Sequence, residues 1–442
     1  MSLINKIRQS EFLSLLRWQD RLGRGRRCMM FSAQLCAPIN ALATGTLYTA
    51  FLTAHEFSMV DVSKLALLPT LASCLCIFSP LLLERFQKRK WILAGGRALY
   101  YTLLFLCLTL LPYLTHNHST RLVGFGVIIF SANAINSLCS SGWTAWHMNF
   151  IPNEVRASYL SYQQISVNIV SSLSMLLFGL IADALRGTPH EASILTGLRL
   201  FGLALAATEV LILTLPHEFP YPRTESRIKL GNIFRLPVRN KRFLLTMGVI
   251  AFWTFLANLP AGGWTYYLLN EVGTGVTLLN VNTILYSLGL LLFSVRWRVT
   301  LSKNSWFLTF ALAAIMSAPA TLALAFIGPG NFVWLYPLVG VLRSFTDVGL
   351  NLSWAGFPYA NTPSTDQTYY LSFYTLIANL SAFLGLSVGT WFIDFFSGQT
   401  FRIFGQAIMP VQLLYFSHGI LMLVCALQIW LCLRWLQPDK QE

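Results

Sequence analysis

The chain has 442 residues, of which 55% are hydrophobic and only 11% are charged. Soluble globular domains carry about 25% charged residues, so a chain this poor in charge cannot cover its surface in water. The formal net charge is +14, which in a soluble protein would suggest a nucleic-acid partner. No zinc-finger spacing or basic-aromatic motif accompanies that charge, which follows membrane topology instead. We therefore expect a polytopic membrane protein that binds no nucleic acid.

The N-terminal residues 1–27 are rich in Arg and carry Leu15, Leu16 and Trp18. The apolar run that follows, from about Cys28 to Ala54, is too long for the roughly 7–15-residue core of a cleavable signal peptide. We predict a first span in this run. The preceding segment 1–27 is predicted to be cytoplasmic and to lie along the inner membrane surface.

Apolar runs of about 20 residues predict twelve transmembrane helices. They cover residues 28–53, 62–83, 91–113, 122–148, 158–183, 195–216, 243–269, 277–295, 305–327, 332–357, 369–394 and 409–433. The longest polar segment, 217–242, is predicted as a central cytoplasmic loop between two six-helix bundles, 28–216 and 243–435. A cytoplasmic tail, 436–442, follows. The predicted fold class is an all-α polytopic membrane protein.

Lys and Arg are divided unequally between the two sides of this predicted topology. With the N-terminus inside, the cytoplasmic segments hold about 24 of the 31 basic residues and the external segments about five. Such a bias predicts that both termini are cytoplasmic. It also explains the net charge, because basic loops contact anionic lipids at the membrane surface.

The sequence carries no motif that would hold a cofactor. The eight Cys residues lie in or beside apolar runs, and their spacing fits neither a zinc site nor a redox motif. No GxxxxGK[ST] loop is present, so ATP is not an evident source of energy. We expect no metal and no cofactor.

An internal repeat relates the two halves. Shifted by 211 residues, segment 159–183 aligns with segment 370–394 without a gap. The matches hardest to attribute to chance pair Trp143, Pro152, Tyr159, Asn168 and Asp183 with Trp354, Pro363, Tyr370, Asn379 and Asp394. Both segments are odd-numbered spans, so they cross the membrane in the same direction. A parallel repeat of this kind predicts two facing halves around a central cavity, an arrangement suited to alternating access.

This architecture resembles the major facilitator superfamily of secondary transporters over about the whole chain. That family has a signature loop between spans two and three, with an Asp-Arg pair between two glycines and basic residues after them. Here Glu84 and Arg85 stand for the pair, and Lys88 and Arg89 belong to the basic tail. The resemblance implies that these four residues form a cytoplasmic latch. The alternative is a loop that serves only as a positive-inside anchor.

Two further features qualify the resemblance. Both glycines of the signature loop are replaced, by Pro80 and Gln87, which puts the tight backbone approach in doubt. The stretch from Trp143 to Leu160 is similar to the junction of spans four and five in one bacterial branch of the superfamily. Its matching residues are Trp143, Trp146, Pro152, Arg156 and Tyr159. The resemblance implies a bacterial cytoplasmic (inner) membrane.

The resemblance also implies that spans one, four, seven and ten line the cavity, flanked by two, five, eight and eleven. Polar and Trp residues gather in several of these spans, whereas spans three and nine are more apolar. Polar groups avoid lipid, so these residues should face inward, either as substrate contacts or as helix-packing contacts. The candidates are Gln34, Asn40, Asn133, Asn136, Gln164, Asn168, Trp253, Asn258, Trp264 and Asn379.

Charges inside spans are more informative, because each costs roughly 2.5–3.5 kcal/mol at the bilayer centre. Arg343 and Asp347 lie four residues apart in span ten, hence on one helix face. The equivalent positions of span four are Ala132 and Asn136, so the pair is an asymmetric feature. We interpret it as a substrate and coupling site, with a self-neutralising packing pair as the alternative.

Other ionisable residues in spans are weaker candidates. Glu209 in span six is either a structural partner or a proton-coupling group. Arg97 in span three is expected to reach the inner surface by snorkelling. Asp183 and Asp394 close their spans as symmetric caps or gates, and His418 is expected to be a hydrogen-bonded packing residue.

The sequence thus predicts a secondary active transporter, not an enzyme, that moves a small organic solute by alternating access with coupling to protons. It is expected to act as a monomer. The alternatives are a transporter-like sensor or assembly protein without turnover, and a membrane-embedded transferase. The transferase lacks support, because the only acidic-basic cluster at an interface, around Glu84, contains no His.

Overall fold

A computed structural model of the chain describes residues 21–83, 86, 88–115, 117–151, 156–218, 230–363 and 367–436. These residues are almost entirely helical, and one short antiparallel hairpin is the exception within them. Residues 1–20 of the predicted interfacial segment 1–27, and residues 437–442 of the predicted tail 436–442, lie outside the described residues. The all-α prediction is confirmed.

Among the described residues, eleven helical segments are long and apolar enough to cross a membrane. Each coincides with a predicted span to within several residues. The remaining predicted span, 332–357, is occupied by the 23-residue helix α17, Phe332–Trp354. It is less apolar because it carries Arg343 and Asp347. The chain is therefore an integral membrane protein.

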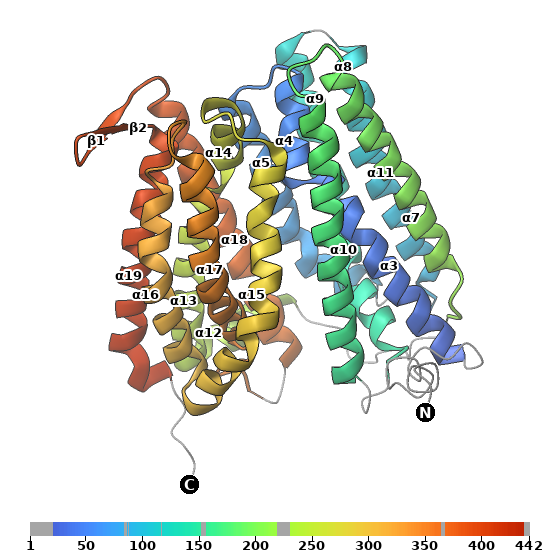
Figure 1. The fold of residues 1–442 in the computed structure, drawn as a ribbon. Helices are drawn as coiled ribbons and strands as arrows, with labels where there is room; N and C mark the ends of the chain where they lie inside the picture. The colour runs from blue at the N-terminus through green and yellow to red at the C-terminus, as the bar shows by residue number, and fades with distance from the viewer. Residues whose placement is uncertain are drawn as a thin grey trace, which may run out of the picture. The chain divides into compact units, whose positions relative to one another are not determined.

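The described chain divides into two compact units, residues 1–55 with 78–227 and residues 56–77 with 228–442. In unit 1, α3 packs against α10 and α11, α7 against α9 and α11, and α6 against α9 (Figure 1). Its elements are α3 (Arg21–Ala43), α4 (Gly45–Ala54), α6 (Ser79–Leu83), α7 (Lys90–Tyr101), the π-helix η2 (Thr102–Cys107), α8 (Leu108–Leu114), α9 (His118–Met148), α10 (Arg156–Ala184) and α11 (Glu191–Thr214).

In unit 2, α16 packs against α17 and α19, α15 against α17, and α13 against α18 and α19. Its elements are α5 (Met59–Ser73), the 3-10 helix η1 (Cys74–Phe78), α12 (Leu230–Arg239), α13 (Lys241–Asn258), α14 (Ala261–Tyr266), the π-helix η4 (Tyr267–Glu271), α15 (Val276–Lys303), α16 (Trp306–Leu324), α17, the 3-10 helix η5 (Phe357–Tyr359), α18 (Gln367–Phe395), β1 (Phe401–Ile403), β2 (Gln406–Ile408) and α19 (Pro410–Leu436). Strands β1 and β2 pair antiparallel, with Arg402 opposite Ala407.

Helix α5 belongs to the segment predicted as the first bundle, yet its contacts assign it to unit 2. It runs antiparallel along α18 with polar contacts at both ends. Lys64 Nζ lies 3.2 Å from Asp394 Oδ2, while Asn379 Nδ2 donates to the Ser73 carbonyl at 3.2 Å. Asp394, predicted as a cap or gate, is thus paired with a residue 330 positions earlier. The six-plus-six domain boundaries stay a prediction.

Close backbone approach explains the packing of α13 on α18. A Cβ added at Gly389 would meet the Leu259 carbonyl oxygen, and one at Gly385 would meet that of Phe255. Only glycine lets two helix backbones come so near, because any side chain would have to displace backbone atoms. These two positions fix the spacing between the helices.

The helix bounds agree with the predicted repeat. Helices α10 and α18 both have 29 residues, and their ends differ by the same shift of 211 residues. The repeated tyrosines also make equivalent contacts: Tyr159 Oη donates to the Arg26 carbonyl at 2.9 Å, and Tyr370 Oη to the Leu236 carbonyl at 3.3 Å. In each half, the tyrosine near the start of the fifth span is thus hydrogen-bonded to the backbone just before the first span of that half.

The central loop predicted for 217–242 contains structure of its own. Helix α12 packs on α18 with Ile233 only 2% exposed, while Phe234 and Val238 remain exposed. Asn240 then caps α13 by accepting a hydrogen bond from the Phe243 amide at 3.1 Å. An amphipathic helix followed by a capped span is typical of a chain that runs along the membrane surface before crossing it.

Candidate functional site

The charged pair on α17 is the centre of the candidate site. Arg343 Nη2 lies 3.3 Å from Asp347 Oδ2, as expected for two side chains one helical turn apart. The two side chains are 34% and 23% exposed, so they are neither buried in packing nor free in solvent. Such partial access inside a membrane span is expected of groups that face a cavity.

Two cavities of about 250 Å³ share this pair. One is lined by Asn282, Thr283 and Tyr286 from α15 together with Gly340 and Ser344 of α17. The other is lined by Trp253, Phe310, Leu350, Asn351 and Trp354. Arg343 and Asp347 line both. One wall is therefore polar and the other aromatic, with the ion pair between them.

Each member of the pair keeps an unused hydrogen-bonding atom. Within the described residues, Arg343 Nε and Asp347 Oδ1 are buried and have no hydrogen-bond partner. Asn282 Oδ1 and both ring nitrogens of His418 are in the same condition. Buried polar atoms are normally satisfied. The unused atoms of Arg343, Asp347 and Asn282, which all line the first cavity, therefore indicate a place where a ligand or water completes the bonding. The prediction that His418 is hydrogen-bonded is not met within this part of the chain.

The other residues predicted in unit 2 differ in their surroundings. Trp253 makes an edge-to-face contact with Phe310, with 4.7 Å between the ring centroids, and both line the aromatic cavity beside the pair. Trp264 is 8% exposed and packs on Tyr415 at 4.1 Å. Asn258 donates to the Thr254 carbonyl of its own helix at 2.8 Å. Asn379 contacts α5, as described above. Of these four, only Trp253 lines a cavity shared with the ion pair.

The residues predicted in unit 1 lie on three helices. On α9, Asn133 donates to the Ile129 carbonyl at 2.8 Å, and Asn136 is half-buried. On α10, Gln164 Nε2 donates to Asn168 Oδ1 at 3.1 Å. On α3, Gln34 is half-buried and Asn40 is exposed. Their role in binding stays a prediction.

The predicted latch is only partly described, since Glu84 and Arg85 lie outside the described residues. Lys88 is exposed. The backbone amides of Arg89 and Lys90 both donate to Glu218 Oε1, at 2.5 and 2.8 Å. A carboxylate at the first turn of α7 satisfies amides that the helix itself cannot. The loop is thus anchored to the end of α11 through Glu218, a residue that the sequence did not single out.

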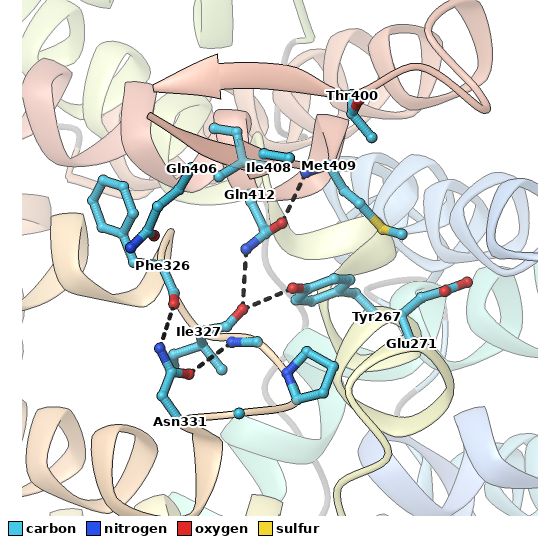
Figure 2. A pocket seen from close by; sticks show the side chains of 14 residues that line it. Tyr267, Glu271, Phe326, Ile327, Asn331, Thr400, Gln406, Ile408, Met409 and Gln412 are labelled. Carbon is cyan, nitrogen blue, oxygen red and sulfur yellow. Dashed lines mark hydrogen bonds between the residues drawn. The ribbon is translucent and has the colours of Figure 1, made fainter. Parts of the chain in front are cut away.

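A further cavity of unit 2, about 500 Å³, lies where α19 begins (Figure 2). Its polar side chains hold the loops together: Gln412 Nε2 donates to the Ile327 carbonyl at 3.0 Å, and its Oε1 accepts from the Met409 amide at 2.8 Å. Tyr267 Oη donates to the same carbonyl at 2.7 Å. The polar atoms of Gln412 and Tyr267 are thus hydrogen-bonded to loop backbone, whereas Arg343 Nε and Asp347 Oδ1 have no partner within the described residues.

Two charged residues of unit 1, predicted within spans, form a pair. Arg97 pairs with Glu209, Oε1 to Nη2 distance 3.6 Å, so the expectation that Arg97 snorkels to the surface is wrong. Glu209 is thus the partner of Arg97, and its role in proton coupling stays a prediction. The pairing was not readable because the two residues are 112 positions apart.

Sequence reasoning missed Arg199, which is 2% exposed on α11. Its Nε donates to Thr109 Oγ1 at 2.8 Å, and its Nη2 donates to the Leu104 carbonyl. Its guanidinium lies 4.6 Å from the Phe51 ring centroid. Leu104 lies in the π-helix η2, where the wider turn makes a carbonyl available to an outside donor. A position four residues inside a predicted span was the only signal.

No protein-family model matches the sequence, and a search of curated proteins found no match. Solved structures do match. A single-residue variant of the nucleoside transporter NupG has a TM-score of 0.66 at 14% identity, covering 92% of this chain and 99% of the other. A D-xylose-proton symporter has a TM-score of 0.65 at 13% identity, with coverage of 96% and 99%. A bacterial metal transporter has a TM-score of 0.66 at 13% identity, with coverage of 93% and 98%.

These similarities extend over nearly the whole length of each chain. The protein therefore shares the fold of these solved transporters, an all-α polytopic membrane fold. The resemblance identified from the sequence is confirmed at the level of the fold.

Proposed function

We propose that the protein is a secondary active transporter that moves a small organic solute across the bacterial cytoplasmic membrane by alternating access. The observation that carries this proposal is the Arg343–Asp347 pair, placed in a membrane-spanning helix between two cavities, with an unused donor and an unused acceptor. A structural pair would gain from complete hydrogen bonding. A substrate site needs groups that are left for the substrate.

The chemistry of the walls indicates the kind of solute. Arg343 offers a fixed cation for an acidic or strongly polar group, and Asp347 offers an acceptor one turn away. Trp253 and Trp354 offer aromatic faces for a ring. Each cavity is smaller than the roughly 300–1,000 Å³ of drug-sized sites, which suits a small solute. Nucleosides and sugars, the solutes in the names of two matched transporters, fit this description in size.

The remaining features fit the same proposal. We propose that Gln34, Asn40, Asn133, Asn136, Gln164, Asn168, Asn258, Trp264 and Asn379 contribute polar or aromatic contacts in the course of the transport cycle. Lys88 and Arg89, with Glu84 and Arg85, would act as the latch. The bias of basic residues supports cytoplasmic termini and contact with anionic lipids. Coupling to protons is part of the proposal, as in the matched D-xylose-proton symporter.

A ligand screen tests the proposal. The purified full-length protein would be heated with nucleosides, pentoses, hexoses and the corresponding sugar acids, and its unfolding temperature recorded. We expect a compound that stabilises the wild type but not Arg343→Gln or Asp347→Asn. Glu271→Gln is the matched control, because Glu271 lines the cavity at the start of α19 and not those that contain the pair, and its removal should leave the stabilisation intact.

The compound found in the screen, tested for flux in proteoliposomes, also separates a transporter from a sensor without turnover. A compound that binds through the pair but never crosses the membrane of proteoliposomes would indicate a sensor without turnover. A compound that stabilises all three variants equally would remove the pair from the binding site.

A further inference from the structure

A second cluster of ionisable side chains lies in unit 1. Glu209 of α11 has a side chain that is 0% exposed. Its Oε1 accepts a hydrogen bond from Ser32 Oγ at 2.7 Å and from Cys36 Sγ at 3.6 Å, both on α3. Arg97 of α7 approaches the same oxygen at 3.6 Å. Three donors from two other helices thus converge on one oxygen of the carboxyl group.

The second oxygen of that carboxyl group is different. Glu209 Oε2 is buried and has no hydrogen-bond partner within the described residues, and Arg97 Nε is in the same condition. An ionised carboxylate withdrawn from water is costly unless both of its oxygens are paired. A protonated carboxyl is neutral and keeps a carbonyl oxygen that accepts hydrogen bonds, as Oε1 does here, so burying its second oxygen without a partner costs less than for a carboxylate. The environment therefore suits a group that gains and loses a proton.

The ion pair with Arg97 is loose enough to allow this change. Its distance of 3.6 Å exceeds the roughly 2.7–2.9 Å of a charge-assisted hydrogen bond. The closest partner of Arg97 Nη2 is instead Cys36 Sγ at 2.9 Å. The guanidinium also lies over two rings, at 5.2 Å from Tyr101 and 5.4 Å from Trp143. These contacts hold Arg97 in place when the carboxylate charge is removed.

We infer that Glu209 is a proton-binding site, with Arg97 as the cation that stabilises its ionised form. The inference rests on the proposed function, because a proton site separate from the Arg343–Asp347 pair would let one ion drive the transport of another solute. The proton adds to Oε2 and leaves from the same atom, and no other bond changes. Protonation removes the negative charge on α11 that attracts Arg97 of α7. The Arg97 guanidinium also lies over the Trp143 ring of α9, so a change in the position of Arg97 also reaches α9.

The other titratable groups around this site are few within the described residues. Cys36 and Tyr101 face Glu209 together with Arg97, and Tyr100 and Cys139 face Arg97. The site is also close to one end of the unit. Arg97 is seven residues from the start of α7 at Lys90, or about 10 Å along the helix axis. A proton has a short path to that end.

Infrared spectroscopy can follow the proton itself, without knowledge of the solute. The full-length protein would be reconstituted in liposomes and titrated with acid while the C=O stretch of protonated carboxyl groups is recorded. We expect a buried-carboxyl band that appears as pH falls and is absent from Glu209→Gln. Glu271→Gln is the control, because Glu271 is an exposed carboxyl whose removal should leave that band unchanged.

Two further variants keep the inference falsifiable if Glu209→Gln folds poorly. Glu209→Asp should retain the band at a shifted frequency. Arg97→Gln should move the midpoint of the titration to higher pH, because the carboxylate loses its cation. A band that is identical in Glu209→Gln and the wild type, or a midpoint unmoved in Arg97→Gln, overturns the inference.

Transport measurements distinguish this inference from the proposed function. If both hold, Glu209→Gln exchanges labelled solute across proteoliposomes at the wild-type rate but loses accumulation driven by a pH gradient. A titrating Glu209 in a protein that moves no solute would overturn the proposed function alone. Accumulation unchanged in Glu209→Gln would overturn the proton site alone.

Discussion

The energetic coupling between Arg343 and Asp347 can be measured by a double-mutant cycle. Two unit charges 3.3 Å apart attract by about 5 kcal/mol at an effective dielectric constant of about 20. The side chains are 34% and 23% exposed, and desolvation opposes the attraction, so the net coupling should be about 1–3 kcal/mol. Arg343→Gln and Asp347→Asn should each destabilise the protein, because each leaves one charge in the membrane without its partner.

The double variant should lose less stability than the sum of the two single losses, since it removes both charges at once. The free energy of unfolding would be obtained for the four proteins by titration with SDS in mixed micelles. Independent sites more than about 7–10 Å apart add to within roughly 0.5 kcal/mol. Losses that add to that accuracy would refute the coupling and with it the view of the pair as one electrostatic unit.

Three other predictions concern the frame that holds the site. Gly389→Ala should destabilise the protein by about 1–3 kcal/mol in the same SDS titration, because its Cβ meets the carbonyl oxygen of Leu259, the residue after α13. Gly248→Ala should not, because a Cβ there meets nothing within 4 Å, and equal effects would contradict the close packing. Tyr159→Phe and Tyr370→Phe should each lower the free energy of unfolding by about 0.5–1.5 kcal/mol, because each removes one hydrogen bond to a backbone carbonyl. A loss in only one of the two variants would argue against the equivalence of these tyrosines in the two halves. Arg199→Met should lower the thermal unfolding temperature, since its buried acceptors lose their donor, whereas an unchanged temperature would mean that other groups satisfy them.

The sequence predicted the spans accurately because hydrophobic length is a local property that the bilayer imposes on each helix. It also predicted the repeat and the Arg343–Asp347 pair, since both depend on spacing along the chain. The ends of the helices were less regular. Helix α15 continues to Lys303, well beyond the predicted end at 295, because a helix can extend into the aqueous layer without a change in pattern.

Contacts between distant segments could not be predicted in this way. Three such contacts join segments far apart in the chain: Arg97 with Glu209, Lys64 with Asp394, and Glu218 with the start of α7. Their meeting depends on how the helices pack, about which periodicity carries no information. A lone charge in a span therefore indicated that a partner exists without indicating which residue it is.

The polar wall of the candidate site was missed for a different reason. Asn282, Thr283 and Tyr286 lie on one face of α15 at the spacing of a helical turn. None of the three is charged, and none stands out in the sequence from the polar residues of other spans. Their position opposite Arg343 is what gives them significance.

Uptake by proteoliposomes tests the central claim most directly. The stabilising compound from the ligand screen would be labelled and offered to vesicles loaded with the same compound unlabelled. We predict that the label accumulates transiently inside vesicles containing the wild type and not in those containing Arg343→Gln. Equal entry into protein-free vesicles, or full accumulation in Arg343→Gln, would contradict the account.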